Sequence, residues 1–167
     1  MPLRELAWDV GFSPCGLLVV LAVFAPNLLM VWLPPRTPMP RVATPLWVGV
    51  LERAGQALCL LVPVVTLPGQ LAWWWALPVI VGLVGYYALW VQYFLTGRMI
   101  AALYRQVWGM PVPMAVLPVL VFFAAACWLR NPWLAASATI LAVGHVHASM
   151  RIARALSESP QFKATTF

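Results

Sequence analysis

The sequence predicts an all-α integral membrane protein, folded as a bundle of about five transmembrane helices. Of its 167 residues, 63% are hydrophobic and only 8% are charged, whereas a soluble globular chain carries about 25% charged residues. Several uncharged stretches also reach the roughly 20 residues that a membrane-spanning helix needs. Strands are not expected, because a backbone in lipid must hydrogen-bond within its own segment or within a closed barrel, and these stretches show no alternation of apolar and polar residues.

Five spans follow from the uncharged stretches and the turn signals between them. The first ends at Pro34-Pro35, and a long uncharged run over 54–97 is divided by the turn sequence Thr66 to Gln70. The last two are divided by Arg130-Asn131-Pro132. The predicted spans are 15–33, 46–66, 71–95, 112–129 and 133–150. They form one domain over 1–155, followed by a short cytoplasmic tail over 156–167.

The basic residues predict the orientation of the spans, since Lys and Arg are enriched in cytoplasmic loops. One side of the predicted bundle holds two basic residues, Arg4 and Arg130. The other side holds seven, namely Arg36, Arg41, Arg98, Arg105, Arg151, Arg154 and Lys163. We therefore expect the N-terminus outside, the C-terminus in the cytoplasm, and a multi-pass location in a cytoplasmic (inner) membrane. The Trp73-Trp74-Trp75 run then lies at the outer interface.

The segment 98–108 has the pattern of a short amphipathic helix. Its apolar residues recur at helical spacing, namely Ile100, Leu103, Tyr104, Val107 and Trp108, and Gly109 and Pro111 follow it. Two interpretations remain open at this point. The segment is either a helix lying on the cytoplasmic surface of the membrane or a simple continuation of the third span.

Polar residues occur in four of the spans at a similar depth, in the cytoplasmic third of the predicted bundle. Such residues are costly in lipid and usually face the bundle interior. Aromatic residues on the third span add one wall to this region. The sequence thus predicts a pocket that is open to the cytoplasmic side. Its candidate ligand-binding residues are Asn27, Glu52, Arg53, Gln56, Tyr86, Trp90, Tyr93, Arg98, His145 and Ser149.

Glu52 is the most informative of these residues. A carboxylate at that depth seeks a partner, and the candidates are Arg53, Arg98 and His145. The carboxylate either fixes helices to each other, contacts a ligand or a proton, or reaches water. His145 and His147 point about 200° apart on a helix, so they cannot bind one metal ion together.

No other motif points to known chemistry. We expect no metal site and no cofactor, and no nucleic-acid partner. Cys15 and Cys127 are both predicted near the outer face, where they form a disulfide if their helices are neighbours and are otherwise free thiols, which is the commoner case.

One family shares several of these features. The five spans, the length and the ten Trp residues resemble the translocator (tryptophan-rich sensory) protein family. The loop Pro34-Pro35-Arg36-Thr37-Pro38-Met39-Pro40, followed by Pro45-Leu46-Trp47 and Leu51, resembles that family's Pro-rich first loop and the start of its second helix. The family's Asn and Trp pattern in the third helix and its aromatic-Asn pattern in the fifth are not found here. The sequence therefore does not assign the chain to that family.

Three functions fit this sequence. The first is a membrane protein that binds or moves a small amphipathic or lipid-like molecule through the cytoplasm-facing pocket. The second is a structural or accessory subunit of a larger membrane complex. The third is an intramembrane enzyme that acts on a lipid, with Glu52 and His145 as acid and base. The expected partners are membrane lipids, a small amphipathic ligand, and a second copy of the chain in a homodimer or a larger membrane complex.

Overall fold

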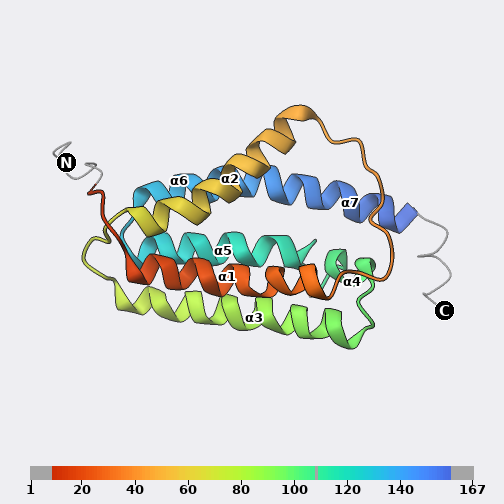
Figure 1. Ribbon diagram of the computed structural model, residues 1–167, viewed down its shortest axis with the longest axis horizontal. Coiled ribbons are helices and arrows are strands. Elements are labelled where there is room, and N and C mark those ends of the chain that lie inside the picture. The colour runs from red at the N-terminus through yellow and green to blue at the C-terminus, as the bar shows by residue number, and fades with distance from the viewer. Residues whose placement is uncertain (1–8, 108, 159–167) are drawn as a thin grey trace.

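The protein is a bundle of helices in the computed structural model, which describes residues 9–107 and 109–158 (Figure 1). Helix accounts for 74% of the structure, and the described residues contain no strand, so the all-α prediction is confirmed. The α-helices are α1 (Pro14–Trp32), α2 (Leu46–Val65), α3 (Ala76–Leu95), α4 (Ile100–Tyr104), α5 (Pro113–Trp128), α6 (Pro132–Leu141) and α7 (His147–Glu158). A 3₁₀ turn, η2 (Trp73–Trp75), precedes α3, and a π-helix, η3 (Ala142–Val146), joins α6 to α7.

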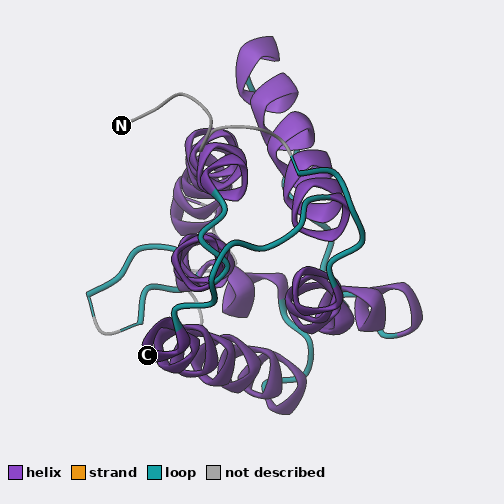
Figure 2. Cartoon of the chain, turned by 90° about the vertical axis from the view of Figure 1, so that its left-hand side faces the viewer, coloured by secondary structure: helices purple, strands orange, loops and turns teal. Residues whose placement is uncertain are grey.

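Three helices are long and apolar enough to cross a membrane. They are Pro14–Trp32, Leu46–Val65 and Trp73–Leu95, the last of which includes η2. Helix α5 is also apolar but has 16 residues. The segments α6, η3 and α7 follow one another without a break and form one continuous rod (Figure 1). Figure 2 looks along the bundle and shows most of the helices end-on, side by side.

The outward faces of the helices are apolar. Leu18, Leu28, Leu61, Ile80 and Val84 are all more than half exposed, and they come from α1, α2 and α3. Large contiguous apolar surfaces of this kind are rare on soluble monomers and mark contact with lipid or with another protein. These apolar faces are therefore suited to contact with lipid or with another protein, which is compatible with a location in a membrane.

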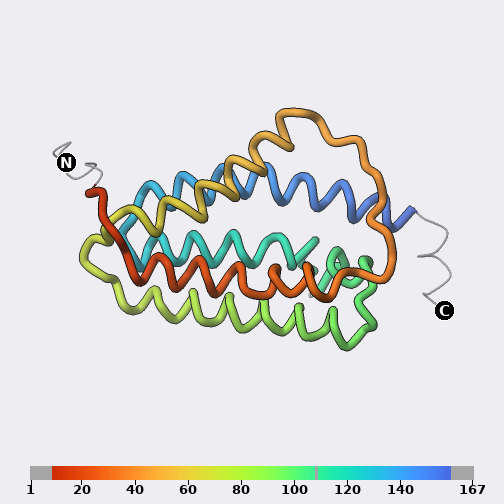
Figure 3. The backbone as a smooth tube through the Cα atoms, in the orientation of Figure 1, coloured from red at the N-terminus to blue at the C-terminus, as the bar shows by residue number. Residues whose placement is uncertain are grey.

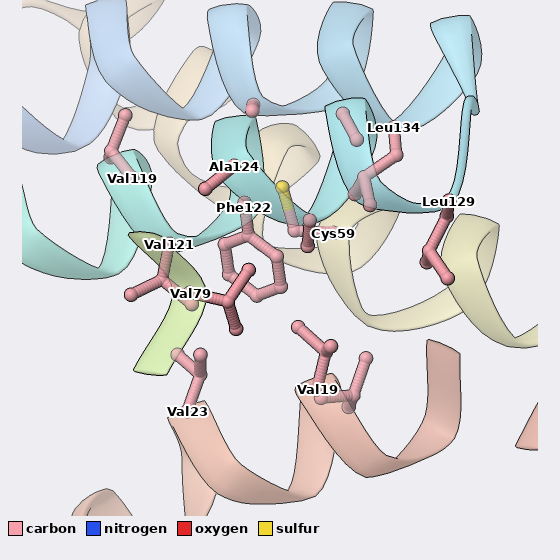
Figure 4. Close-up of a cluster of buried hydrophobic side chains, with 14 of the residues drawn as sticks. Val19, Val23, Cys59, Val79, Val119, Val121, Phe122, Ala124, Leu129 and Leu134 are labelled. Carbon is pink, nitrogen blue, oxygen red and sulfur yellow. The ribbon is translucent and has the colours of Figure 1, made fainter. Parts of the chain in front are cut away.

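The core lies between α1, α2, α5 and α6. Its centre contains Val19, Cys59, Phe122 and Leu134, which approach one another from these four helices (Figure 4). Small residues allow α5 and α6 to come close, because they leave little between the two backbones. Those that are buried are Ala124, Ala125, Ala126, Ser137 and Ala138.

Hydrogen bonds connect the loops at one end of the bundle, which we call the hydrogen-bonded end (residues 9–13, 66–72 and 129–131). The Asn131 side chain caps α6 by accepting from the Leu134 amide at 3.0 Å, and it donates to the Thr66 hydroxyl at 2.6 Å. The Gly69 amide donates to the Leu129 carbonyl, and the Leu67 amide donates to the Asp9 carbonyl. The beginning of α6 and the end of α2 are thus held together at this end.

Helix α2 touches the α6–η3 rod backbone to backbone. A Cβ on Gly55 would overlap the backbone of Leu141, and a Cβ on Gly144 would overlap the backbone of Glu52. Near the hydrogen-bonded end, Gly16 of α1 meets the carbonyl of Pro63 in the same way. These contacts require glycine because no side chain fits in the space between the helices.

Helices α1 and α2 diverge away from their crossing at Gly16 and Pro63 (Figure 1). Loop 33–45 spans the wide end of this V (Figure 3). Its Thr37 hydroxyl accepts from the Ile100 amide at 3.0 Å, and its Ala43 carbonyl accepts from Arg151 at 2.9 Å. The loop is therefore attached to α4 on one side and to α7 on the other.

In the segment 98–108 the structure excludes a continuation of the third span and forms a helix that is shorter than the pattern indicated. Helix α3 ends at Leu95, and Gly97 and Arg98 have φ angles of 77° and 60°, so the backbone leaves the helical conformation and α3 does not continue. The helix that follows, α4, has five residues and ends at Tyr104. Trp108 lies outside the described residues.

The last helix extends further than the predicted fifth span. The sequence predicted a span over 133–150, whereas the helical rod continues through η3 and α7 to Glu158. The predicted tail over 156–167 therefore begins within α7, and its residues 159–167 lie outside the described residues. The apolar pattern ends near 150, but helical hydrogen bonding does not depend on that pattern.

The close contact at Gly55 gives the first prediction. A Gly55→Ala variant should lower the free energy of unfolding by about 1–3 kcal/mol, because α2 and α6 must move apart to admit the methyl group. Gly49→Ala in the same helix is the control, since nothing lies within 4 Å of a Cβ there. It should keep or slightly raise stability, as alanine favours helix. Thermal unfolding in detergent measures both, and equal melting of the two variants would contradict the contact.

Candidate functional site

A cavity of about 220 Å³ lies in the V between α1 and α2, and α3, α4, α5, η3 and α7 close it from behind. Its wall is mainly apolar and aromatic. Six of the ten residues that the sequence singled out line it: Asn27, Gln56, Tyr86, Trp90, His145 and Ser149. Residues from α1, α2, α3 and the α6–α7 rod thus meet at one place, although the sequence places them far apart.

The cavity runs from an exposed mouth to a buried wall. Asn27 of α1 and Gln56 of α2 are exposed, and Met39 of loop 33–45 lies beside them at 51% exposure. Tyr86 and Trp90 of α3 are buried, with 2% and 4% of their surface exposed. A molecule that enters between α1 and α2 therefore passes polar groups before it reaches the aromatic wall.

Asn27 and Tyr86 form a hydrogen bond whose direction can be assigned. The Asn27 side-chain nitrogen lies 3.1 Å from the Val23 carbonyl oxygen and 2.9 Å from the Tyr86 hydroxyl. A carbonyl oxygen only accepts, so the atom facing it must be the amide nitrogen and not the amide oxygen. Its two hydrogens serve Val23 and Tyr86. The Tyr86 oxygen is then the acceptor, and its own proton has no acceptor among residues 9–107 and 109–158.

Trp90 adds a second unused donor to the same wall. Its indole nitrogen is buried and has no hydrogen-bond partner in the described part of the chain. The Tyr86 hydroxyl lies near that nitrogen, but not in hydrogen-bonding geometry. The two rings are one helical turn apart on α3 and meet edge to face, with centroids separated by 6.3 Å. Two donors without acceptors therefore lie next to each other on α3, in residues that line the cavity.

Glu52 finds its partner in His145. The Glu52 carboxylate oxygen lies 2.8 Å from Nδ1 of His145, and the structure does not bring Arg53 or Arg98 into an ion pair with it. His145 belongs to η3, where the wider π-turn changes the direction of the side chains, and π-turns of this kind are frequent at functional sites. The contact of Gly144 with the Glu52 backbone brings the two side chains together. The carboxylate orients the imidazole, as carboxylates do at many His sites.

Tyr104 brings another hydroxyl to the cavity from α4. Burial raises the pKa of this hydroxyl, and the negative charge of Glu52 raises it further. The group therefore stays protonated at physiological pH and can donate a hydrogen bond. No pattern in the sequence had indicated Tyr104 as a site residue, but its place on the apolar face of 98–108 could have done so.

Four of the predicted site residues do not line the cavity. Glu52 reaches it only by way of His145. Arg53 is exposed on α2, and Arg98 lies in the turn after α3, where its carbonyl accepts from the Arg36 amide. Tyr93 is fully buried and packs edge-to-face against Trp90, in a second apolar cluster with Ile100 and Leu103.

The remaining lining residues are apolar and could not be identified from the sequence. Phe122, Met114, Ala115 and Pro118 come from α5, which carries no polar residue near the cavity. An apolar side chain on an apolar helix gives no signal that it faces a cavity rather than lipid or the core.

The described residues contain no group of three or more His, Cys, Asp or Glu side chains that could hold a metal ion. All three cysteines are free thiols. Cys15 packs against the core from α1, whereas Cys127 is exposed at the end of α5, beside the groove between α3 and α5. The disulfide considered from the sequence is therefore not formed.

Comparisons with protein-family models, with curated proteins and with solved structures find no match to this chain.

The Glu52–His145 pair gives the second prediction. Glu52→Ala should lower the free energy of unfolding by about 1–3 kcal/mol, because it leaves a half-buried imidazole nitrogen without its partner. A double-mutant cycle with His145→Ala should show a coupling of at least about 0.5 kcal/mol. The matching cycle with Arg98→Ala should show almost none. Stronger coupling to Arg98, measured by unfolding in detergent, would mean that the pairing is wrong.

Proposed function

We propose that the chain is a multi-pass membrane protein that binds or moves a small amphipathic or lipid-like molecule in the cavity between α1 and α2. The observation that carries this proposal is an apolar, aromatic-walled cavity at whose mouth and wall polar groups from several helices converge. Ligand sites in proteins commonly combine an apolar lining with a few placed polar groups. The volume accommodates about seven groups the size of a water molecule, so part of a longer ligand extends through the mouth.

The proposed arrangement in the membrane has five crossings. They are α1, α2, α3 with η2, α5, and the rod of α6, η3 and α7. The distribution of charge supports an N-terminus outside and a C-terminus in the cytoplasm of an inner membrane. In the described part of the chain, the hydrogen-bonded end carries Arg130. The opposite end carries Arg36, Arg41, Arg98 and Arg105 in its loops and Arg151 and Arg154 in α7. The mouth of the cavity then faces the cytoplasmic leaflet.

This orientation gives the third prediction. In a variant without native cysteines, a cysteine at exposed Gly69 should react in intact cells with a thiol reagent that does not cross membranes. A cysteine at exposed Gln106, at the opposite end, should react only after permeabilisation. The reverse pattern would overturn the orientation, and labelling of both sites in intact cells would exclude an odd number of crossings between them.

The binding function gives the fourth prediction. Purified protein in detergent should bind 1-dodecanoylglycerol, a single-chain amphiphile, with binding measured by native mass spectrometry. Gln56→Trp should weaken this binding at least tenfold, because the indole fills the mouth from an exposed position and leaves the core unchanged. Ala57→Trp is the matched control, exposed on the same helix and outside the cavity. Equal binding by both variants would place the amphiphile elsewhere and contradict the proposal.

A second candidate function is that of an accessory subunit, and a groove on the outer face of α3 and α5 favours it. The groove has a volume of about 950 Å³. Small residues of α3 line it and project little into it, namely Gly82, Gly85 and Ala88. Small residues of this kind allow another helix to approach closely in a membrane. A partner polypeptide or a second copy that is cross-linked through a cysteine at Ala88 would support this function.

The intramembrane-enzyme alternative rests on the Glu52–His145 pair. Glu52 occupies Nδ1 of His145, and Nε2 has no partner in the described ranges, so it is free to exchange a proton with a bound molecule. Ser149 lies one turn further on and also lines the cavity. This alternative would be favoured over simple binding if the protein hydrolyses the ester bond of 1-dodecanoylglycerol and the His145→Gln variant does not.

A further inference from the structure

We propose that the cavity recognises the carbonyl oxygen of an uncharged ester or ketone, through the Tyr86 hydroxyl and the Trp90 indole N–H together. This inference rests on the proposed binding function and names the chemical class of the ligand. It is carried by the two buried donors on α3 that line the cavity and have no acceptor in the described part of the chain.

Leaving these two donors unused costs free energy. A buried N–H or O–H without an acceptor costs about 1–3 kcal/mol, and most buried polar groups in proteins are hydrogen-bonded. Here the Asn27 amide makes the shortage of acceptors worse. The hydrogen bond to the Val23 carbonyl fixes the orientation of this amide, so its nitrogen donates to the Tyr86 oxygen. The Tyr86 proton must therefore point away from Asn27.

The missing acceptor is best supplied by a carbonyl group. A carbonyl oxygen has two lone pairs and no proton, so one atom can accept from two neighbouring donors. A hydroxyl group would bring a further donor to a place that already has too many. The rings of Tyr86 and Trp90 meet edge to face at a centroid distance of 6.3 Å, and the Tyr86 hydroxyl lies near the indole nitrogen, so the two donors are adjacent and one carbonyl oxygen is the acceptor that would serve both.

The charge of the ligand follows from the same wall. No Lys or Arg side chain lines the cavity among the described residues. An ionised carboxylate or phosphate placed against Tyr86 and Trp90 would therefore meet two neutral donors and no Lys or Arg, and an uncompensated buried charge is far more costly than a buried amide or ester. The aromatic and methionine side chains around the two donors are suited to an apolar chain attached to the carbonyl.

The test compares two probes that differ by one carbonyl group. The probes are 1-dodecanoylglycerol, an ester, and 1-O-dodecylglycerol, the ether that lacks the carbonyl oxygen. Two hydrogen bonds of ordinary net strength predict that the wild-type protein binds the ester roughly tenfold more tightly than the ether. Native mass spectrometry with both probes in one sample gives this ratio directly.

Two conservative variants identify the donors. Tyr86→Phe and Trp90→Phe each remove one donor and keep an aromatic ring in the wall, so each should reduce the preference for the ester over the ether to less than about threefold. Tyr87→Phe is the matched control. Its hydroxyl lies on the next face of α3 and donates to the Ala22 carbonyl at 2.8 Å, outside the cavity, so it should keep the full preference.

Each outcome separates this inference from the proposed function. Equal binding of ester and ether by the wild-type protein, or an unchanged preference in both variants, would overturn the inference and leave the binding function standing. Absence of binding for both probes would contradict the binding function and the inference with it. Thermal unfolding of each variant confirms that it is folded, and if one variant does not fold, the other still decides the result.

Discussion

The backbone contact between α2 and the α6–η3 rod is the constraint on which the rest of the structure depends. Gly55 and Gly144 allow α2 to lie directly on the rod, and this contact directs α2 away from α1 beyond their crossing at Gly16. The space that results is the cavity. The same contact brings Glu52 to His145, so the polar pair and the cavity have a common origin in the absence of two side chains.

The location of the site could be predicted from the sequence because of a simple energetic argument. A polar side chain in an apolar helix avoids lipid, and several at one depth must meet inside the bundle. The sequence selects Asn27, Gln56 and His145 on this ground, and the structure places all three around one cavity. Arg53 and Arg98 share that depth but not the cavity, because long cationic side chains at the end of a span can reach water. Depth along a helix can be read from a sequence, whereas the direction in which a residue faces depends on its neighbours.

Helix boundaries show a similar division. The first residues of α1 and α6 can be predicted from local sequence, because Ser13 and Asn131 cap the N-termini of these helices and a proline follows each cap. The break after α3 requires Arg98 to adopt the left-handed backbone conformation, which is uncommon for a residue other than glycine. The only sequence signal for this break is the neighbouring Gly97. The π-helix η3 has no comparable sequence signal. It depends on the fit between Gly144 and Glu52, which lie far apart in the chain.

The two ends of the bundle differ in a way that limits how a bound molecule could travel. Hydrogen bonds between residues 9–13, 66–72 and 129–131 close one end, and at that end α1 and α2 cross with no room for a side chain. At the other end only loop 33–45 spans the gap (Figure 3). Under the proposed function, a molecule that enters by this route would also leave by it. The cavity would then serve as a reservoir that exchanges with one leaflet, and its occupancy would report the composition of that leaflet rather than any flow across the membrane.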